Sequence, residues 1–257
     1  ETISVYPGEN SNKITIAGFI PVSYSTMETY VNVHQPALYT ASAFAKILKD
    51  KGIKLKGHVR LIDLKKEIYK RNELVMLCSY KSPPLPQAIA YINKESDNLS
   101  AEMLLKTLGG IYNGYGTSEN GSSIVKGFLV YIGTDVKGLT MVDGSGLSPE
   151  NRITARIIVD ILTFMYRSEY RKSFMDSLSV AGVDGTLKKR LRGTGAKGNL
   201  KGKTGTLNGV SSLSGYVTTS YGQSLVFSIV SNNVPEWAAK DGEDRIVTVL
   251  ASCKKPI

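Results

Sequence analysis

The run Lys203-Thr204-Gly205-Thr206 has the residue types of a site that binds an anion or a carbonyl group. It lies at the end of a predicted strand, just before an Asn-Gly turn. A lysine ammonium supplies positive charge there, and a glycine lets a substrate backbone approach an edge strand whose N–H groups are unpaired. Alone, the run is better explained by an ordinary strand end that carries a solvated lysine.

A second run, Ser96-Asp97-Asn98, lies between two predicted helices at residues 87–95 and 99–108. Ser, Asp and Asn are preferred at helix starts, so the run is compatible with a purely structural capping role. In the functional interpretation, a hydroxyl and an amide on a rigid turn relay a proton and hold a peptide carbonyl. The two runs become informative together, because Ser-x-Asn is followed much later by Lys-Thr-Gly-Thr.

This pair of motifs, in this order, resembles two of the three active-site signatures of penicillin-binding proteins and serine β-lactamases. Four longer blocks narrow the resemblance to the class C low-molecular-mass penicillin-binding proteins, the D-alanyl-D-alanine carboxypeptidases and endopeptidases of the bacterial envelope. These blocks are residues 93–102, 142–148, 180–187 and 203–210. The resemblance implies a penicillin-binding transpeptidase fold of the α+β class, an α/β sandwich of an antiparallel sheet with helices.

The resemblance also implies a role for each residue of the 203–206 run. Lys203 lends positive charge to the site, and Thr204 and Thr206 hold the terminal carboxylate of the substrate. Gly205 belongs to the same substrate-binding stretch, whose strand offers a backbone N–H to the oxyanion. The implied substrate is the stem peptide of peptidoglycan, and β-lactams are implied as inhibitors that stop the reaction at the acyl-enzyme.

In the same family pattern, Ser96 belongs to a proton relay and Asn98 binds the peptide group of the substrate. The third signature, Ser-x-x-Lys, carries the nucleophile and its base and precedes Ser-x-Asn. No serine upstream of Ser96 is followed by a lysine three residues later. We therefore expect the nucleophile to lie outside this chain. Residues 1–34 are then the remnant of an inserted β-rich domain, and residues 35–257 form the C-terminal part of the peptidase domain.

Ser123 and Lys126 form a Ser-x-x-Lys run elsewhere, on a predicted helix where positions three apart share a face. This run follows Ser-x-Asn instead of preceding it, which is the wrong order for the family. A rearranged serine hydrolase that uses Ser123 and Lys126 stays open as an alternative. So does a non-catalytic module that binds peptidoglycan without turnover.

Composition restricts the other function classes. The chain has 257 residues, 42% of them hydrophobic, and a formal net charge of +10. The charge favours anionic surfaces, but the basic residues are spread along the chain without regularly placed aromatics, which argues against nucleic-acid binding. The densest basic cluster, residues 188–192, is interpreted first as a solvated helix end and second as an anion-binding patch. No run approaches the roughly 18 to 20 apolar residues of a membrane span.

Metal and histidine chemistry are not expected either. The two histidines, His34 and His58, have no ligand-type spacing around them, so neither a zinc site nor a Ser-His-Asp triad is predicted. No cofactor is implied. Cys78 and Cys253 leave the disulfide state open. A periplasmic or envelope location follows from the resemblance alone, and an uncovered sheet edge makes a homodimer an expectation.

The expected elements place both motifs. Strands are predicted at 200–207, 211–219 and 224–230, joined as an antiparallel meander and followed by a helix at 235–253 that packs on the sheet. A helix is expected to begin at Pro149 with Ser148 as its N-cap, and another to follow Gln35. A strand pair is expected at 55–77.

Overall fold

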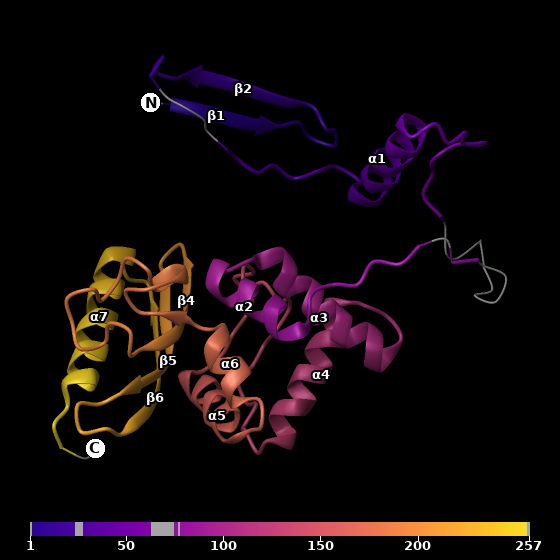
Figure 1. Cartoon of the computed structure of the whole chain (residues 1–257). Helices are drawn as coiled ribbons and strands as arrows, with labels where there is room; N and C mark the ends of the chain where they lie inside the picture. Colours follow the sequence, from indigo (N-terminus) through magenta and orange to yellow (C-terminus); the bar gives the residue numbers. More distant parts are fainter. Residues whose placement is uncertain (1, 24–27, 63–74, 77, 256–257) are drawn as a thin grey trace. The chain divides into compact units, whose positions relative to one another are not determined.

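The chain consists of two compact units, Glu1–Tyr80 and Lys81–Ile257. The computed structural model describes residues 2–23, 28–62, 75–76 and 78–255 (Figure 1). The division falls later than the boundary expected near residue 34, and the origin of residues 1–34 in an inserted domain stays a prediction.

The first unit contains a β hairpin and one helix. Strands β1 (Thr2–Pro7) and β2 (Ile14–Phe19) pair in antiparallel register, and helix α1 spans Pro36–Asp50, close to where the sequence predicts it. The Asn12 side chain accepts a 2.7 Å hydrogen bond from the backbone N–H of His34, which ties the hairpin turn to the segment before α1. The strand pair expected at 55–77 is not found in its described part, residues 55–62 and 75–76, which form no strand. Residues 63–74 and 77 lie outside the described residues.

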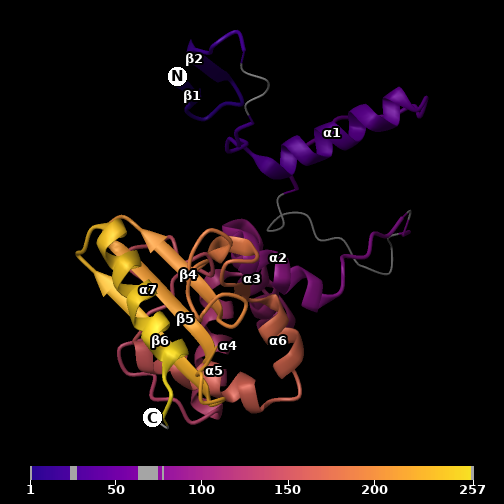
Figure 2. The ribbon, with the colours of Figure 1, turned by 60° about the vertical axis from the view of Figure 1, so that its left-hand side comes forward.

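The second unit is built around an antiparallel sheet in the order β3-β4-β5-β6 (Figures 1 and 2). Its strands are β3 (Ser179–Val180), β4 (Lys201–Leu207), β5 (Val210–Thr218) and β6 (Ser224–Asn232). The predicted meander is thus confirmed to within two residues at each end. Short turns join β4 to β5 and β5 to β6, so consecutive strands are neighbours.

Helices cover both faces of this sheet. Helix α7 (Glu236–Ser252) packs one face, where Val217 of β5 and Val247 are both buried. Helices α5 (Ala155–Arg167) and α6 (Arg171–Ser177) cover the opposite face, where the neighbouring Tyr216 is buried. Adjacent strand residues point to opposite faces, so both layers rest on β5. The fold is α+β, a sandwich of sheet and helices.

A helical group precedes the sheet. It comprises α2 (Leu85–Glu95), α3 (Asn98–Asn113) and α4 (Ser118–Tyr131). Helices α3 and α4 pack closely because Gly121 of α4 lies against Leu105 of α3.

The start of α5 differs from the prediction. The helix begins at Ala155, not at Pro149, and its N-cap is Thr154, whose hydroxyl accepts from the Ile157 N–H at 3.2 Å. Ser148 is held instead in a loop by Asp143, which accepts its backbone N–H at 2.9 Å. A local side chain competes here with the helix for the backbone donors, as short polar residues often do.

The basic cluster at 188–192 is not a fully solvated helix end. Within it, Arg190 follows the short 3₁₀ helix η2 (Gly185–Leu187) and directs its guanidinium against α7. It forms ion pairs of 2.8 Å with Glu243 and 2.7 Å with Asp244. The fully buried Glu243 also accepts 2.7 Å from the Ser211 hydroxyl of β5. Lys188, Lys189 and Arg192 remain exposed as expected.

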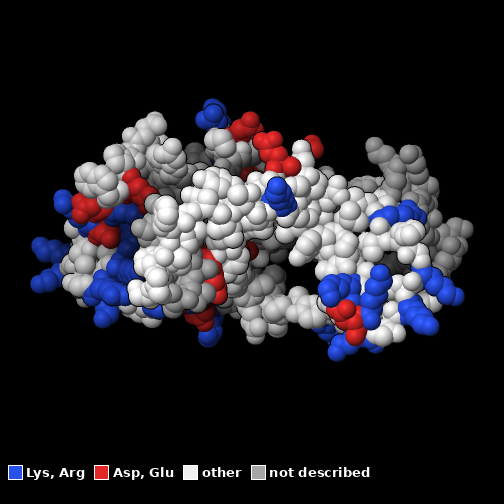
Figure 3. Space-filling view, turned by 90° about the horizontal axis from the view of Figure 1, so that it is seen from above, with Lys and Arg blue, Asp and Glu red and all other residues white. Residues whose placement is uncertain are grey.

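Charge on the surface is mixed. Figure 3 shows Lys and Arg in several separate groups with Asp and Glu among them, not in one continuous band over the described residues of this face. Among the described residues, no helix has the length and apolar character needed to cross a membrane.

We expect Gly121→Ala to destabilise the protein by about 1–3 kcal/mol. The added Cβ would overlap the Leu105 carbonyl oxygen and lie 2.7 Å from its Cγ, so α3 and α4 must move apart. Gly127→Ala, in the same helix but facing open space, is the matched control and should stabilise by about 0.5–1 kcal/mol. Urea unfolding measures both, and equal effects of the two changes would contradict the close-packing argument.

Arg190→Ala should lower the free energy of unfolding by about 3–5 kcal/mol, because it leaves the buried Glu243 carboxylate without its ion-pair partner. Arg245, also on α7, pairs with Asp241 at 2.9 Å, but its side chain is 79% exposed. Arg245→Ala should therefore change stability by less than about 1 kcal/mol. Chemical denaturation of the two variants at neutral pH compares them, and a small effect of Arg190→Ala would show that this ion pair is dispensable.

Candidate active site

The structure brings the two predicted motifs together across 107 residues of sequence. The Lys203 amine donates a hydrogen bond of 2.5 Å to the Ser96 hydroxyl and one of 2.7 Å to the backbone oxygen of Thr204. Ser96 lies at the junction of α2 and α3, whereas Lys203 belongs to β4, which lies beside α2 in Figure 1. The contact therefore joins the helical group to the edge of the sheet.

Ser96 has an unusual backbone conformation. It ends α2 with φ 57° and ψ 44°, the left-handed region that costs a non-glycine residue about 1–2 kcal/mol. Asp97 then serves as the N-cap of α3 and accepts from the Ser100 N–H at 2.7 Å. Hydrogen bonds from Ser100 hold the pKa of Asp97 below its ordinary value. The capping role considered for the whole run is thus carried by Asp97 alone.

Asn98 is the first residue of α3 and is exposed. Its side chain makes no hydrogen bond with the described residues, so its amide is available to a ligand. Asn98 and the Ser96 hydroxyl are separated only by the capping Asp97, on a junction whose backbone is fixed by that cap.

Two contacts fix the end of α2 just before Ser96. Asn93 donates 2.8 Å to the Ser177 hydroxyl at the end of α6, and Lys94 forms a 2.5 Å ion pair with Asp184. Burial opposes ionisation of Asp184, but the bonds from Lys94 and from a backbone N–H outweigh it, so its pKa lies below the ordinary value. The junction is thereby attached to the segment that precedes β4.

The Lys203–Thr206 run lies on an exposed edge of the sheet. Strand β3 pairs only with Lys201 and Gly202, so from Lys203 onward this side of β4 has no strand partner among the described residues. Such an edge presents backbone donors and acceptors to an extended ligand. Gly205 has a packing role as well, because an added Cβ would lie 2.6 Å from the Ser212 hydroxyl of β5.

A hollow of about 570 Å³ opens at the end of β4. Thr206 lines it together with the β4–β5 turn and the residues that lead into α7, numbered 207–209 and 233–236. The edge of β4 therefore continues into a concave surface.

Burial acts on the charge of Lys203. Its amine lies among protein groups that remove most of its water, and this desolvation lowers the pKa of Lys203 from the ordinary value of 10.5. The two groups that accept from this amine, the Ser96 hydroxyl and the Thr204 backbone carbonyl, are both uncharged. The site thus holds a cation that lacks an anionic partner among the described residues.

A second family block, residues 142–148, is a loop fixed to α3. Glu102 of α3 accepts 2.5 Å from the Ser118 hydroxyl and 2.6 Å from the Gly144 N–H. These bonds hold the pKa of Glu102 below its ordinary value. Asp143 accepts from the N–H groups of Gly146 and Ser148 at 2.6 and 2.9 Å. The contacts of this block are those of a well-fixed loop.

The alternative pair Ser123 and Lys126 lies on α4, which packs against α3. The Ser123 hydroxyl donates 2.7 Å to the Asn120 carbonyl and accepts 3.3 Å from Asn113. No hydrogen bond joins Ser123 to Lys126 within the described part of the chain. The pair is therefore separate in its contacts from the Ser96–Lys203 group.

Metal ligands and disulfides do not contribute to the described site. No group of three His, Cys, Asp or Glu side chains that could hold a metal ion occurs among the described residues. Cys78 and Cys253 are free thiols.

Two contributions to the site were not predicted from the sequence. These are the Lys94–Asp184 ion pair and the Thr186 hydroxyl, which lies 2.8 Å from the Thr204 hydroxyl. Both belong to the family blocks 93–102 and 180–187. These blocks could have indicated that the residues belong to the site. The sequence could not indicate that Lys94 pairs with Asp184, because the two lie 90 residues apart and no spacing rule connects them.

The Lys203 amine should titrate at a lower pH than an ordinary lysine, because burial disfavours its charged form. Reductive ¹³C-methylation followed by an NMR pH titration measures this, with Lys203→Arg as the variant that identifies the resonance. The sign follows from linkage. The unfolded chain binds this proton more tightly, so the cost of burying the charge is present at neutral pH and is lost as pH rises toward 10.5. A resonance that titrates with the other lysines would contradict the assignment.

Comparison with known proteins agrees with this geometry. The model of the D-Ala-D-Ala carboxypeptidase 3 (S13) family matches residues 3–253. A D-alanyl-D-alanine carboxypeptidase of Actinomadura sp. (strain R39) is 35% identical over 246 residues, which cover 94% of this chain and 45% of that protein. Carboxypeptidase DacB of Mycolicibacterium smegmatis is 31% identical over 183 residues, covering 69% of this chain and 40% of that protein.

The fold has a close counterpart among solved structures. Penicillin binding protein 4 (dacB) from Haemophilus influenzae matches with a TM-score of 0.83 at 25% sequence identity, over 98% of this chain and 57% of that one. The chain spans less than half the length of the curated relatives it matches. By its family match, its identity to these relatives and the motifs that meet at Ser96 and Lys203, the chain belongs to the D-Ala-D-Ala carboxypeptidase 3 (S13) family, the class C low-molecular-mass penicillin-binding proteins.

Proposed function

We propose that this chain forms the substrate-binding side of a serine-type D-Ala-D-Ala carboxypeptidase or endopeptidase site that acts on peptidoglycan stem peptides. The observation that carries the proposal is the 2.5 Å hydrogen bond from Lys203 to Ser96, which unites the Lys-Thr-Gly-Thr and Ser-x-Asn motifs. Membership of the S13 family supports the same reaction class. In that reaction a serine attacks the carbonyl of the penultimate D-alanine and releases the terminal residue, and water then hydrolyses the acyl-enzyme intermediate.

The proposed roles follow from position and chemistry. Ser96 relays a proton, since its hydroxyl already accepts from an amine whose pKa is lowered. Asn98 offers a free amide to the peptide group of the substrate. Lys203 attracts the substrate carboxylate, which Thr204 and Thr206 hold through their hydroxyls.

The edge of β4 supplies the hydrogen-bond donors for the developing oxyanion. A substrate laid along residues 203–206 meets backbone N–H groups that have no strand partner, and one of these serves the oxyanion of the tetrahedral intermediate. The strand ladder on its other side holds β4 in place against β5. A donor fixed in this way needs no reorganisation when negative charge develops.

The nucleophile is proposed to come from a Ser-x-x-Lys segment that is not among these 257 residues. The support is that no such run precedes Ser96 in the sequence. Among the contacts of the described residues, Ser123 and Lys126 have no hydrogen bond with each other or with the Ser96–Lys203 group. β-Lactams are proposed to acylate that same serine. The protein is further proposed to lie in the periplasm or the cell envelope and to form a homodimer. The proposed reaction uses no cofactor.

A fluorescent penicillin with intact-mass detection tests the proposal. We expect a covalent adduct on a longer polypeptide that extends this chain upstream of Glu1, and none on the 257-residue chain alone. In the longer polypeptide, Ser96→Ala should slow acylation by about 10²- to 10⁴-fold through loss of proton relay. Ser123→Ala should acylate normally and is the matched control.

Other outcomes separate the alternatives. A stoichiometric adduct on the 257-residue chain that Ser123→Ala abolishes would establish the rearranged hydrolase that uses Ser123 and Lys126. Binding of a D-Ala-D-Ala peptide, with neither polypeptide acylated or active, would establish a non-catalytic peptidoglycan-binding module.

A further inference from the structure

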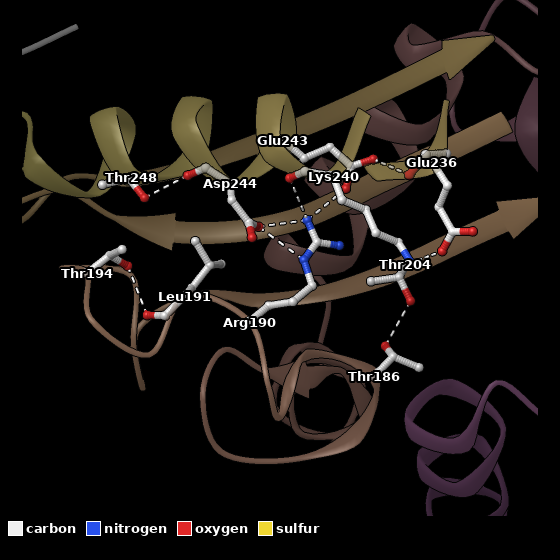
Figure 4. Close-up of polar contacts among 11 residues, drawn as sticks. Thr186, Arg190, Leu191, Thr194, Thr204, Glu236, Lys240, Glu243, Asp244 and Thr248 are labelled. Carbon is white, nitrogen blue, oxygen red and sulfur yellow. Dashed lines mark hydrogen bonds and ion pairs between the residues drawn. The ribbon is translucent and has the colours of Figure 1, made fainter. Parts of the chain in front are cut away.

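The hydroxyl of Thr204 is one end of a short chain of hydroxyl groups. It lies 2.8 Å from the Thr186 Oγ1, which lies 3.3 Å from the Ser179 Oγ. The Thr186 backbone N–H also donates to that serine oxygen at 3.2 Å. Figure 4 shows the Thr186 and Thr204 hydroxyls pointing toward each other across the gap between the η2 segment and β4.

The segment that carries Thr186 is fixed on both sides. Gly185 has φ +54°, and an added Cβ there would overlap the Ser179 hydroxyl, so the backbone lies close to β3. On the other side of Thr186, Leu187 is fully buried in the core between the sheet and α7. Asp184 is paired with Lys94, and Arg190 is held by Glu243 and Asp244 (Figure 4). Thr186 is therefore an exposed hydroxyl on a rigid support.

The numbers of hydrogen-bond donors and acceptors at Thr204 and Thr186 indicate what the Thr186 hydroxyl does when a ligand binds. A threonine hydroxyl has one proton to donate, and in the ligand-free arrangement Thr204 donates it to Thr186. To bind a carboxylate, Thr204 must turn that proton toward the ligand. Its oxygen then keeps its contact with Thr186 only if Thr186 donates in return, and the Ser179 hydroxyl can donate to Thr186 in the same direction.

We propose that Thr186 is a positioning residue for the substrate carboxylate: its hydroxyl reverses from acceptor to donor and holds the Thr204 hydroxyl in the orientation that donates to the ligand. This inference rests on the proposed role of Thr204 in binding the terminal carboxylate. Such a chain strengthens each bond because every hydroxyl that donates becomes a better acceptor. Because hydrogen bonds to a charged acceptor are stronger, the gain should be larger for a ligand that ends in a carboxylate than for one that ends in a neutral amide.

The test compares two ligands on the full chain. An N-acylated stem peptide that ends in D-Ala-D-Ala carboxylate and the same peptide with a C-terminal amide are titrated by NMR into the wild type, Thr186→Val and Thr186→Ser. Thr186→Val keeps the β-branched shape and removes the hydroxyl. Thr186→Ser keeps the hydroxyl. Thermal unfolding of all three proteins reports whether the substitution disturbs the fold.

We expect Thr186→Val to weaken binding of the carboxylate peptide by about three- to tenfold, the loss of one net hydrogen bond. Thr186→Ser should stay within about twofold of the wild type, since the donor is retained. Binding of the amide peptide, whose neutral acceptor forms the weaker hydrogen bond, should differ by less than about twofold among the three proteins.

Two results would overturn the inference while leaving the proposed function intact. One is unchanged binding of the carboxylate peptide by Thr186→Val. The other is equal weakening for the carboxylate and the amide, which identifies a structural effect on the cleft. A wild-type chain that binds neither peptide, or does not distinguish them, would instead count against the proposed carboxylate site at Thr204 and remove the basis of the inference.

Discussion

The buried carboxylate of Glu243 is the point at which three parts of the second unit are tied together. It lies on α7, accepts from Ser211 of β5, and pairs with Arg190 of the segment that leads into β4. A charge removed from water is tolerated only when its partners satisfy it, so these three parts must keep their relative positions. The edge of β4 depends on this constraint, because the segment held by Arg190 also carries Thr186, whose hydroxyl contacts that of Thr204.

The site is assembled from both sides of that edge. On one side, Lys94 pairs with Asp184, which anchors the end of α2 to the same segment. On the other, β5 holds β4 along its whole length. The 2.5 Å contact between Ser96 and Lys203 is thus supported by two independent attachments. Rigid support of this kind lets a desolvated amine keep one geometry instead of moving out to solvent.

How much the sequence could predict differs between the sheet and the segments that precede it. The strands and α7 were predicted closely because Asn-Gly and Tyr-Gly turns punctuate alternating apolar residues. The predicted start of α5 at Pro149 is wrong because the carboxylate of Asp143 accepts the hydrogen bond of the Ser148 backbone N–H and holds this segment in a loop. The sequence predicts a solvated Arg190, which is wrong, because the partners of this side chain lie more than 50 residues away on α7. Local patterns predict elements, whereas long-range polar pairing is visible only in three dimensions.

The left-handed backbone of Ser96 has a consequence for relatives of this chain. Glycine adopts that conformation without strain, and asparagine tolerates it better than serine. When the hydroxyl is not needed for function, substitution to Gly or Asn is therefore favoured at this position, because it lowers the backbone strain. A homologue that retains serine in this conformation is under continuing selection for the hydroxyl. One with glycine has lost the hydroxyl and has removed the backbone strain of the turn. The residue at this single position can thus help to distinguish catalytically active homologues from inactive ones.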